Sequence, residues 1–415
     1  MKRAIFISLL SFILFPILSQ NFTFSDSARV SLLTCSPGKK VYEKFGHTAI
    51  RVNDPVTGID VVFNFGVFDF NTKNFYLKFV KGETDYQLAV YDTKSFLEEY
   101  KNRNSIVWEQ KLNLTLDEKR NLLHSLLKNY EPENRFYRYN FVYDNCSTRP
   151  RDKIVQSING RVEYQLFTEP ATFREMISEY TGENSWLQFG LDLIFGCDAD
   201  KTVSRNVSMF LPENLMYEFQ AAHIIDPNGA KRHLISESGT LISKQEEKFS
   251  NLLPIFQPMF VCTFLLILGI IITIFNNQKS FRLFDSLLYI ISGLGGIVVF
   301  YLAFFSSHPL VKNNFNLLWL NPLNFVLGIL LWFHKMKPYV FYYQVLNCFL
   351  IFLALVAYAA GFQVFNPASF PLILLLLLRS VRWTATTKKD FSQKKKNNRS
   401  YYTNGNGLHQ HTRKK

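Results

Sequence analysis

Two short segments of the chain carry residue types that can do covalent chemistry. Phe45-Gly46-His47-Thr48-Ala49-Ile50 places a histidine at the head of an apolar strand, and Tyr143-Asp144-Asn145-Cys146-Ser147-Thr148-Arg149 places a cysteine where a helix begins. A thiol at a helix N-terminus meets the positive end of the helix dipole, which favours the thiolate, and a nearby imidazole can take its proton. Backbone N–H groups at the same helix start could hold an oxyanion. The pair predicts acyl transfer through a thioester, with Cys146 as nucleophile and His47 as base.

A histidine that acts as a base needs a third group that fixes its orientation. We predict Asn64, in Phe63-Asn64-Phe65-Gly66 on the following strand, for this part. Asp60 and Asp69 remain as alternatives. A lone histidine on a strand is also compatible with a purely structural place in the core.

The outer part of the chain contains three cysteines, Cys35, Cys146 and Cys197. In an oxidising compartment Cys146 could pair with either of the others, and at least one thiol would be left outside any pair among them. A structural disulfide is therefore an alternative to a catalytic thiol at Cys146.

Other catalytic signatures are missing from the sequence. It has no His-Glu-x-x-His, no Gly-x-Ser-x-Gly and no phosphate-binding loop, and His124, His223 and His233 lack ligand spacing. We expect neither a metal nor another cofactor.

The elements that must position these residues are predicted to be mixed α/β with an antiparallel part. Strands at 47–53 and 59–65 form a hairpin, because Asp54-Pro55 and Thr57-Gly58 mark a turn between them. Thr115 and Glu118 form a capping box for a leucine-rich helix that ends near Asn129. Further expected elements are strands at 31–34 and 86–91, a helix up to residue 45, helices at 71–81, 94–102 and from the Cys146 segment toward Ile158, several short helices within 167–216, and a hairpin turn at 226–229.

Hydrophobicity divides the chain into four parts. Residues 1–20, a basic start followed by an apolar run, are typical of a signal peptide or signal anchor. Residues 21–250 would form an extracytoplasmic domain, and 251–383 an all-α transmembrane bundle of about five helices, since a span needs about 20 apolar residues. The expected spans are 255–275, 286–305, 315–333, 339–362 and 365–378. The last contains Pro367 and Pro371 and is expected to be tilted or partly re-entrant.

The net charge of +13 is concentrated beside these spans. Residues 21–254 contain 28 Lys and Arg against 31 Asp and Glu, so the excess lies in the C-terminal part. This distribution of basic residues follows the positive-inside rule for an outward domain and a cytoplasmic tail. We expect the tail, residues 384–415, to be disordered. The excess basic charge therefore does not indicate nucleic-acid binding. The inward basic residues are Lys279, Arg282, Lys335, Lys337, Arg379, Arg382, Lys388, Lys389 and Lys394-Lys395-Lys396.

The motifs resemble a known family. They are similar to the outer domain of the Lnb family of bacterial lipoprotein N-acyltransferases, and the hydrophobic half is similar too, so the resemblance covers most of residues 25–380. The order of histidine before cysteine also resembles circularly permuted papain-like folds, such as NlpC-type peptidases and lecithin:retinol acyltransferases. The motifs that carry the resemblance are Cys35-Ser36-Pro37-Gly38, Phe45-Gly46-His47-Thr48-Ala49, Asn64-Phe65-Gly66, Tyr139-Asn140-Phe141 and Asp144-Asn145-Cys146-Ser147-Thr148-Arg149.

The resemblance implies an α+β, permuted papain-like (NlpC-type) extracytoplasmic domain on a multi-pass protein of the bacterial cytoplasmic (inner) membrane. It implies an enzyme that moves an acyl chain from a membrane phospholipid to the α-amine of the lipidated N-terminal cysteine of a lipoprotein. Cys146 would accept the acyl group, and His47 would act as the base.

Four further residues are predicted to bind substrate. Asn145 and Arg149 lie next to Cys146 in the sequence, and His308 and Asn316 lie in an unusually polar outward segment between two spans. Polar groups at the membrane boundary are often functional, and this segment could shape the entry of lipid or acceptor. Alternatives to substrate binding remain. Arg149 could be a solvated surface charge, and the polar segment could be an interfacial loop with Asn caps.

Two other functions fit the same sequence. One is a membrane-tethered cysteine hydrolase, an amidase or peptidase that acts on cell-wall peptide or lipid. The other is a non-enzymatic binding or scaffolding module with Cys146 in a disulfide. A reactive Cys146 thiol would favour the acyltransferase or the hydrolase over the binding or scaffolding module.

Overall fold

The computed structural model describes residues 25–68, 72–165, 170–182, 184–244, 254–275 and 278–408. The predicted signal segment 1–20 and the alternative orienting residue Asp69 lie outside these ranges. The chain forms two units: one holds the residues up to Thr181 with Lys201–Ser250 and Ser306–Pro309, and the other holds the rest. The predicted domain boundaries remain predictions, and Gly182–Asp200 groups with the helical unit.

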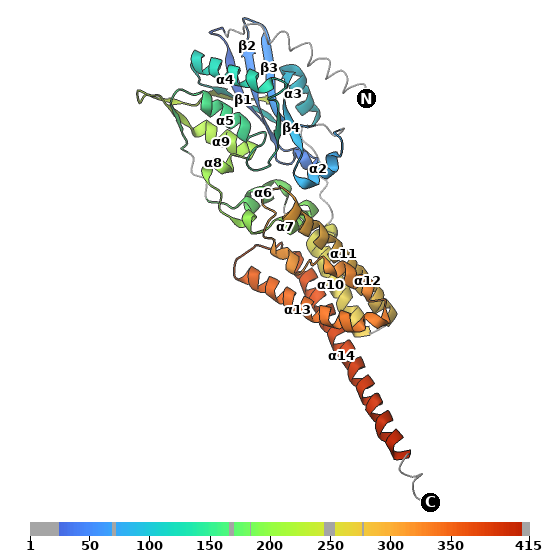
Figure 1. Ribbon diagram of the computed structural model, residues 1–415. Helices are drawn as coiled ribbons and strands as arrows, with labels where there is room; N and C mark the ends of the chain where they lie inside the picture. Colours follow the sequence, from blue (N-terminus) through green and yellow to red (C-terminus); the bar gives the residue numbers. More distant parts are fainter. Residues whose placement is uncertain are drawn as a thin grey trace, which may run out of the picture. The chain divides into compact units, whose positions relative to one another are not determined.

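A seven-stranded sheet forms the centre of the first unit (Figure 1). Its order is β10-β5-β1-β2-β3-β4-β6, and all neighbouring strands are antiparallel. The predicted hairpin is present, with Ile50 opposite Phe63. The strands are β1 (Arg29–Cys35), β2 (His47–Asp54), β3 (Ile59–Val67), β4 (Asp85–Asp92), β5 (Val107–Leu112), β6 (Phe136–Arg138) and β10 (Ile235–Ile242).

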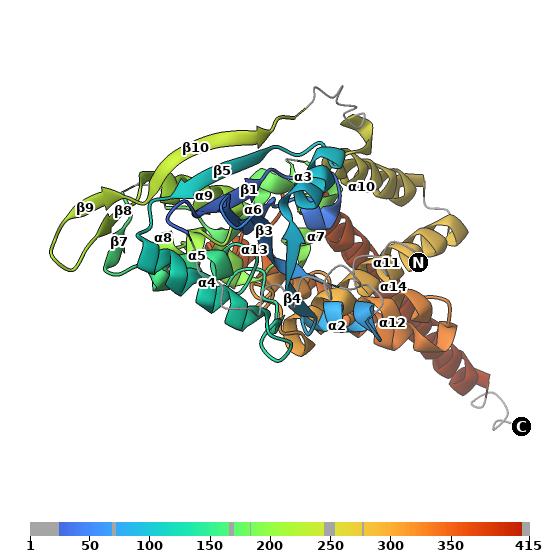
Figure 2. The ribbon, with the colours of Figure 1, turned by 90° about the horizontal axis from the view of Figure 1, so that it is seen from above.

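The strands β5 and β10 were not predicted from the sequence. Figure 2 shows β10 lying along β5, and these two strands form one edge of the sheet. All residues of β10 after Ile235 are exposed or only partly buried. An edge strand of this kind has no continuous apolar face, so its sequence carries little strand signal.

Helices cover both faces of the sheet because successive strand residues point to opposite sides. One face packs on α4 (Leu116–Tyr130), α5 (Thr148–Ser157) and α9 (Pro212–Ala221), and the other on α3 (Thr93–Asn102). Burial of such side chains contributes roughly 1.5–3 kcal/mol each to the free energy of folding. The first face includes Leu32, Ile50, Phe63, Leu122, Ile154 and Phe219. The second includes Leu33, Ala49, Val62, Phe96 and Tyr100.

Smaller elements complete the first unit. They are η1 (Val41–Glu43), α2 (Phe75–Lys81), α6 (Phe173–Thr181), α8 (Arg205–Ser208) and the small sheet of β7 (Arg161–Glu163), β8 (His223–Ile225) and β9 (Lys231–His233). The predicted turn at 226–229 joins β8 to β9, with the Gly229 N–H donating to the Asp226 carbonyl. The predicted helix up to residue 45 is only the three-residue turn η1.

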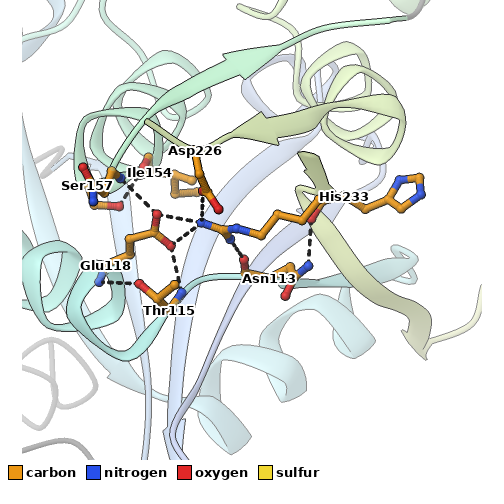
Figure 3. Close-up of polar contacts among 9 residues, drawn as sticks. Asn113, Thr115, Glu118, Ile154, Ser157, Asp226 and His233 are labelled. Carbon is orange, nitrogen blue, oxygen red and sulfur yellow. Dashed lines mark hydrogen bonds and ion pairs between the residues drawn. The ribbon is translucent and has the colours of Figure 1, made fainter. Parts of the chain in front are cut away.

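The predicted capping box at the start of α4 is present and forms the centre of a polar cluster (Figure 3). Glu118 is 1% exposed, and its carboxylate accepts hydrogen bonds from the Thr115 N–H, the Asn159 N–H and the guanidinium of Arg232. Arg232 also pairs with Asp226. A buried carboxylate needs several such partners. The cluster therefore ties the start of α4 to the end of α5 and to the β8–β9 hairpin.

Among its described residues, the second unit contains four helices that are long and apolar enough to cross a membrane. They lie in α10 (Pro258–Phe275), α11 (Gln278–Phe305), α13 (Lys337–Ala359) and α14 (Ser369–Leu408). The predicted third span is instead the short helix α12 (Leu323–Leu330) preceded by the turn η4 (Phe315–Leu318), and Pro322 sits at the α12 N-cap. The bundle of about five helices is thus four long ones and one short one. The remaining helical elements are α7 (Trp186–Ile194), η2 (Cys197–Asp200), η3 (Pro254–Phe256) and η5 (His334–Met336).

The last helix differs from its prediction at both ends. The stretch expected to be tilted or re-entrant is the start of α14 and belongs to the candidate span Ser369–Lys389. The helix then continues to Leu408, through most of the segment that we expected to be disordered. No proline follows Pro371, and the lysines, arginines and glutamines of this segment are good helix formers.

From the sequence, Arg379 was grouped with the basic residues on the cytoplasmic side of the membrane. In the structure its side chain is buried. Arg379 and Asp285 are both fully buried within the second unit, with Nε–Oδ1 and Nη2–Oδ2 distances of 2.6 and 3.0 Å. The indole N–H of Trp383 donates to the same carboxylate. Removal of one partner of a buried ion pair typically costs about 3–5 kcal/mol. The pair thus holds α14 to α11.

Candidate active site

A glycine turn delivers His47 to the start of β2. Gly46 has φ +73°, and its N–H donates to the Glu43 carbonyl. A Cβ at Gly46 would lie 2.6 Å from the Cys35 carbonyl oxygen, so no other residue fits without displacement. The turn places His47 opposite Cys35 in the β1–β2 register.

The structure brings the imidazole of His47 against the side chain of Asn64. His47 Nε2 lies 2.5 Å from Asn64 Oδ1. Because an amide oxygen can only accept, Nε2 carries the proton and Nδ1 remains the basic nitrogen. Of the two alternatives, Asp60 instead binds Arg51 and Thr93, and Asp69 is outside the described residues.

An aromatic side chain lies on the His47 ring, and a cationic side chain lies over that aromatic ring. The ring of Tyr100 stacks on it with centroids 6.3 Å apart, and the Arg103 guanidinium lies 4.8 Å from the Tyr100 ring centroid. Burial lowers the pKa of His47, and the positive charge of Arg103 adds to this effect in spite of the Asn64 hydrogen bond. The imidazole is therefore neutral at pH 7.

Cys146 lies two residues before α5 begins at Thr148, in a segment fixed by Asn145. The Asn145 side-chain oxygen accepts the N–H groups of Ser147 and Thr148 at 2.8 and 2.9 Å. Its amide nitrogen donates to the carbonyls of Phe141 and Phe210. The amides that we expected to hold an oxyanion are thus already engaged, and Asn145, predicted to bind substrate, has its side-chain amide engaged within the protein.

The thiol differs from its predicted charge state. Burial raises the pKa of Cys146 to about 11, although the N–H groups of Thr48 and of Cys146 itself point to the sulfur and partly offset this. The predicted lowering by the helix dipole was wrong, because burial dominates and Asn145 caps the helix start. The resting site is a neutral thiol beside a neutral imidazole, and Cys146 keeps partial exposure to solvent.

Three side chains converge on Gly66, which has φ +87° in an irregular part of the β3–β4 pairing. A Cβ at Gly66 would lie 3.2 Å from Cys146 Cβ, 3.8 Å from His47 Cε1 and 3.9 Å from the Tyr137 hydroxyl oxygen. Cys146, the imidazole and the phenol therefore pack around Gly66 so closely that a side chain at this position would displace the Cys146 side chain. The three functional side chains thus lie near one another around this glycine.

Tyr137 was not among the residues predicted to act at the site. Its hydroxyl is buried and donates to no acceptor among the described residues, while the Gly66 N–H faces its oxygen. Burial, with the nearby Cys146 sulfur, raises the pKa of Tyr137 well above the ordinary value, so the hydroxyl keeps its proton. An unused buried donor close to a nucleophile is an arrangement suited to oxyanion binding. The only sequence signal was its place in a tyrosine-rich stretch shortly before Cys146.

Arg149, the second predicted substrate ligand beside the thiol, is already engaged. Its guanidinium forms hydrogen bonds of 2.6 and 2.8 Å with the Asp144 carboxylate. It also lies 3.5 Å from the centre of the Tyr137 ring. These contacts hold Asp144 and Tyr137 in place beside Cys146.

His308 and Asn316 make their polar contacts with other segments of the chain. His308 is in the first unit, where its Nε2 lies 2.7 Å from the Phe79 carbonyl oxygen at the end of α2. Asn316 is in the second unit and 1% exposed, and its amide nitrogen donates to the carbonyls of Asp192 and Leu193. Its side-chain oxygen accepts from the indole of Trp319. Substrate binding by either residue remains a prediction.

The predicted disulfide alternatives are not formed. Cys35 and Cys146 are free thiols, and the Cys197 sulfur lies 2.9 Å from the Asn313 carbonyl oxygen. Burial raises the pKa of Cys35 far above its usual range, so this thiol stays protonated. Cys146 is therefore available as a nucleophile in this structure.

The raised thiol pKa makes a prediction for chemical labelling. The rate of Cys146 alkylation by iodoacetamide should increase about tenfold per pH unit between pH 7 and 9, because only the thiolate reacts and its fraction grows tenfold per unit below the pKa. Peptide mass spectrometry across pH values measures the rate, and Cys146→Ser controls for the other thiols. A rate independent of pH between 6 and 8 would indicate a preformed thiolate and contradict the neutral resting site.

Comparison with known families gives two matches that together cover most of the chain. Residues 19–179 match the family model described as the Lnb N-terminal periplasmic domain, and residues 247–390 match the Lnb transmembrane domain. No curated protein and no solved structure matches the chain. The first match contains His47, Asn64 and Cys146, and the second contains all four candidate membrane spans. The chain therefore belongs to the Lnb family, as a membrane protein of the lipoprotein N-acyltransferase type with a periplasmic N-terminal domain.

Proposed function

We propose that the protein is a thiol-dependent acyltransferase that moves an acyl chain from a membrane phospholipid to the N-terminal amine of diacylated lipoproteins. The observation that carries the proposal is the convergence of Cys146 and the hydrogen-bonded His47–Asn64 pair on Gly66. A nucleophile, a base and a group that orients the base are the parts required for covalent acyl transfer. The membership in the Lnb family agrees with this chemistry.

In the first half-reaction the Cys146 sulfur attacks an ester carbonyl of the phospholipid. His47 Nδ1 takes the thiol proton as the C–S bond forms, and the Tyr137 hydroxyl donates to the developing oxyanion. The ester C–O bond then breaks, and His47 returns the proton to the leaving alcohol of the lysophospholipid. A neutral thiol and imidazole suit this sequence, because the proton moves only when substrate is present.

In the second half-reaction the acceptor amine attacks the thioester. A C–N bond forms and the C–S bond breaks, while His47 carries a proton from the nitrogen to the Cys146 sulfur. The products are an N-acylated lipoprotein and the regenerated thiol. Asn64 holds the imidazole in one orientation during both half-reactions, as its short hydrogen bond with Nε2 indicates.

A phospholipid donor is supported by the surface of α2. This helix exposes Tyr76, Leu77, Phe79 and Val80, with exposed fractions of 42–75%, beside Lys78 and Lys81. Apolar and aromatic side chains with lysines are typical of helices that lie in a membrane interface. His308 and the Ser307 N–H bind carbonyls at the end of α2 and fix this helix. The membrane spans keep the thiol close to its lipid substrate, which raises the effective concentration of that substrate.

The test of the proposal is a two-substrate assay with the purified full-length protein. The vesicles contain a phospholipid with a labelled acyl chain, and the acceptor is a synthetic diacylated lipopeptide. We expect labelled N-acyl lipopeptide and lysophospholipid in equal amounts. Release of free fatty acid with no N-acylated product would contradict the proposal and favour a membrane-tethered hydrolase.

A further inference from the structure

A cavity of about 270 Å³ lies in the first unit beside the proposed base. His47, Asn64 and Gly66 form part of its wall. Gly66 also packs against the Cβ of Cys146, although Cys146 is not itself part of the cavity wall. A group bound in the cavity would be next to the base.

The wall also contains a buried carboxylate that is not fully used. The Glu43 side chain is 7% exposed, and its Oε2 accepts the Lys40 N–H at 3.3 Å. Oε1 is buried and accepts no hydrogen bond among the described residues. The nearest cations are Lys40 Nζ at 3.6 Å and Arg103 Nε at 3.7 Å, which is beyond hydrogen-bond length. A buried carboxylate oxygen of this kind has the capacity to accept a further donor.

The charged groups at the cavity balance one another. Its lining contains Glu43, Glu99 and Arg103, and the ammonium of Lys40 lies 3.6 Å from Glu43 Oε1. Arg103 contacts both glutamates. The Lys40 side chain is 66% exposed, so a substrate ammonium would take its place at Glu43 Oε1.

The remaining walls suit an ammonium group. The rings of Tyr42, Phe68 and Tyr100 line the same cavity, and the rings of Tyr42 and Phe68 meet edge to face with centroids 6.1 Å apart. Aromatic faces attract ammonium groups through their quadrupoles. A primary ammonium could thus bind one carboxylate oxygen directly while its carbon chain lies against the rings.

We propose that this cavity binds the primary ammonium group of a substrate, with Glu43 as its principal ligand. The inference rests on the proposed function, which has two sources of such a group: the α-amine of the lipoprotein acceptor and the amine of an ethanolamine headgroup on the donor. In either case Glu43 acts in binding. A bound acceptor ammonium gives one proton to water before its nitrogen attacks the thioester, and His47 and Cys146 then act as in the second half-reaction. Glu99, at the more exposed side of the cavity, adds negative charge.

The test compares Glu43→Gln with Glu98→Gln in the full-length protein. Glu98 is exposed on α3 and outside the cavity, so it is a matched control. Thioester formation on Cys146 is measured with phosphatidylglycerol vesicles and with phosphatidylethanolamine vesicles, and transfer is measured against the concentration of a diacylated lipopeptide. If the ammonium belongs to the acceptor, Glu43→Gln raises the KM for the lipopeptide about tenfold or more and leaves thioester formation unchanged.

If the ammonium belongs to the donor, Glu43→Gln slows thioester formation from phosphatidylethanolamine about tenfold and leaves that from phosphatidylglycerol unchanged. Glu98→Gln should behave as the unaltered protein in all arms. A Glu43→Gln protein with unchanged thioester formation and unchanged KM would overturn the amine site. A protein without substitutions that forms no thioester would contradict the proposed function itself.

A measurement on the unaltered protein covers the case in which Glu43→Gln does not fold. Ethylammonium chloride should inhibit either the transfer step or thioester formation from phosphatidylethanolamine, in competition with the amine substrate. Sodium chloride at the same concentration should not. Equal inhibition by the two salts would overturn the proposal.

Discussion

Replacement of Cys146 by serine should abolish the conversion of diacylated to triacylated lipoproteins. A serine hydroxyl is a far weaker nucleophile than a thiol beside a neutral imidazole, so we expect a loss of at least about 10³-fold. The measurement is mass spectrometry of lipoproteins from cells that lack another N-acyltransferase. This substitution changes one atom and leaves the Asn145 cap of α5 in place, so a defect in folding is not expected.

The matched control for this variant is Cys197→Ser. The Cys197 thiol lies 2.9 Å from the Asn313 carbonyl oxygen, and a serine hydroxyl can keep this contact. It should leave the conversion at the level of the unaltered protein. Normal triacylation in cells that carry Cys146→Ser would rule out Cys146 as the nucleophile.

Replacement of His47 by alanine should slow thioester formation by about 10²–10⁴-fold, the usual contribution of a general base. The buried thiol, with a pKa near 11, then has no group to accept its proton at neutral pH. Single-turnover formation of the Cys146 adduct measures the effect. Asn64→Ala should give a smaller loss, because the base would remain and only its orientation would be released.

The control for His47→Ala is His124→Ala, which changes an exposed histidine of α4. Added imidazole should restore part of the rate to His47→Ala, since a diffusible base can enter the space left by the side chain. A His47→Ala protein with a rate within about threefold of the unaltered one would contradict the role of the base.

Local patterns predicted the elements that carry the site. The hairpin of β2 and β3 follows from alternation and turn residues within 20 positions, and the capping box of α4 follows from Thr115 and Glu118. The pairing of His47 with Asn64 could be predicted because both lie on this one hairpin. These features depend on residues that are close in the sequence.

Features that depend on distant contacts could not be predicted. The sequence suggested an activated thiolate, but the burial that raises the pKa of Cys146 is created by segments from across the first unit. The Asn145 cap involves Phe210, and the place of Tyr137 beside the thiol depends on β6 joining the edge of the sheet. The unused oxygen of Glu43 likewise has no sequence signal.

In the membrane unit, too, local features could be predicted and contacts between distant residues could not. Hydropathy located all the apolar stretches, because composition alone decides them. It could not show that Pro322 divides the third stretch, or that Arg379 turns inward to meet Asp285 from another helix. Contacts between separate helices decide both outcomes.

The central claim is that Cys146 carries the acyl group between donor and acceptor. The most direct test incubates the full-length protein with phospholipid vesicles and no acceptor, and then measures the mass of the peptide that contains Cys146. We predict an increase by one acyl group that hydroxylamine removes and that disappears when a diacylated lipopeptide is added. N-acylation of the lipopeptide with no adduct on Cys146 at any time, or with an adduct on another residue, would contradict the account.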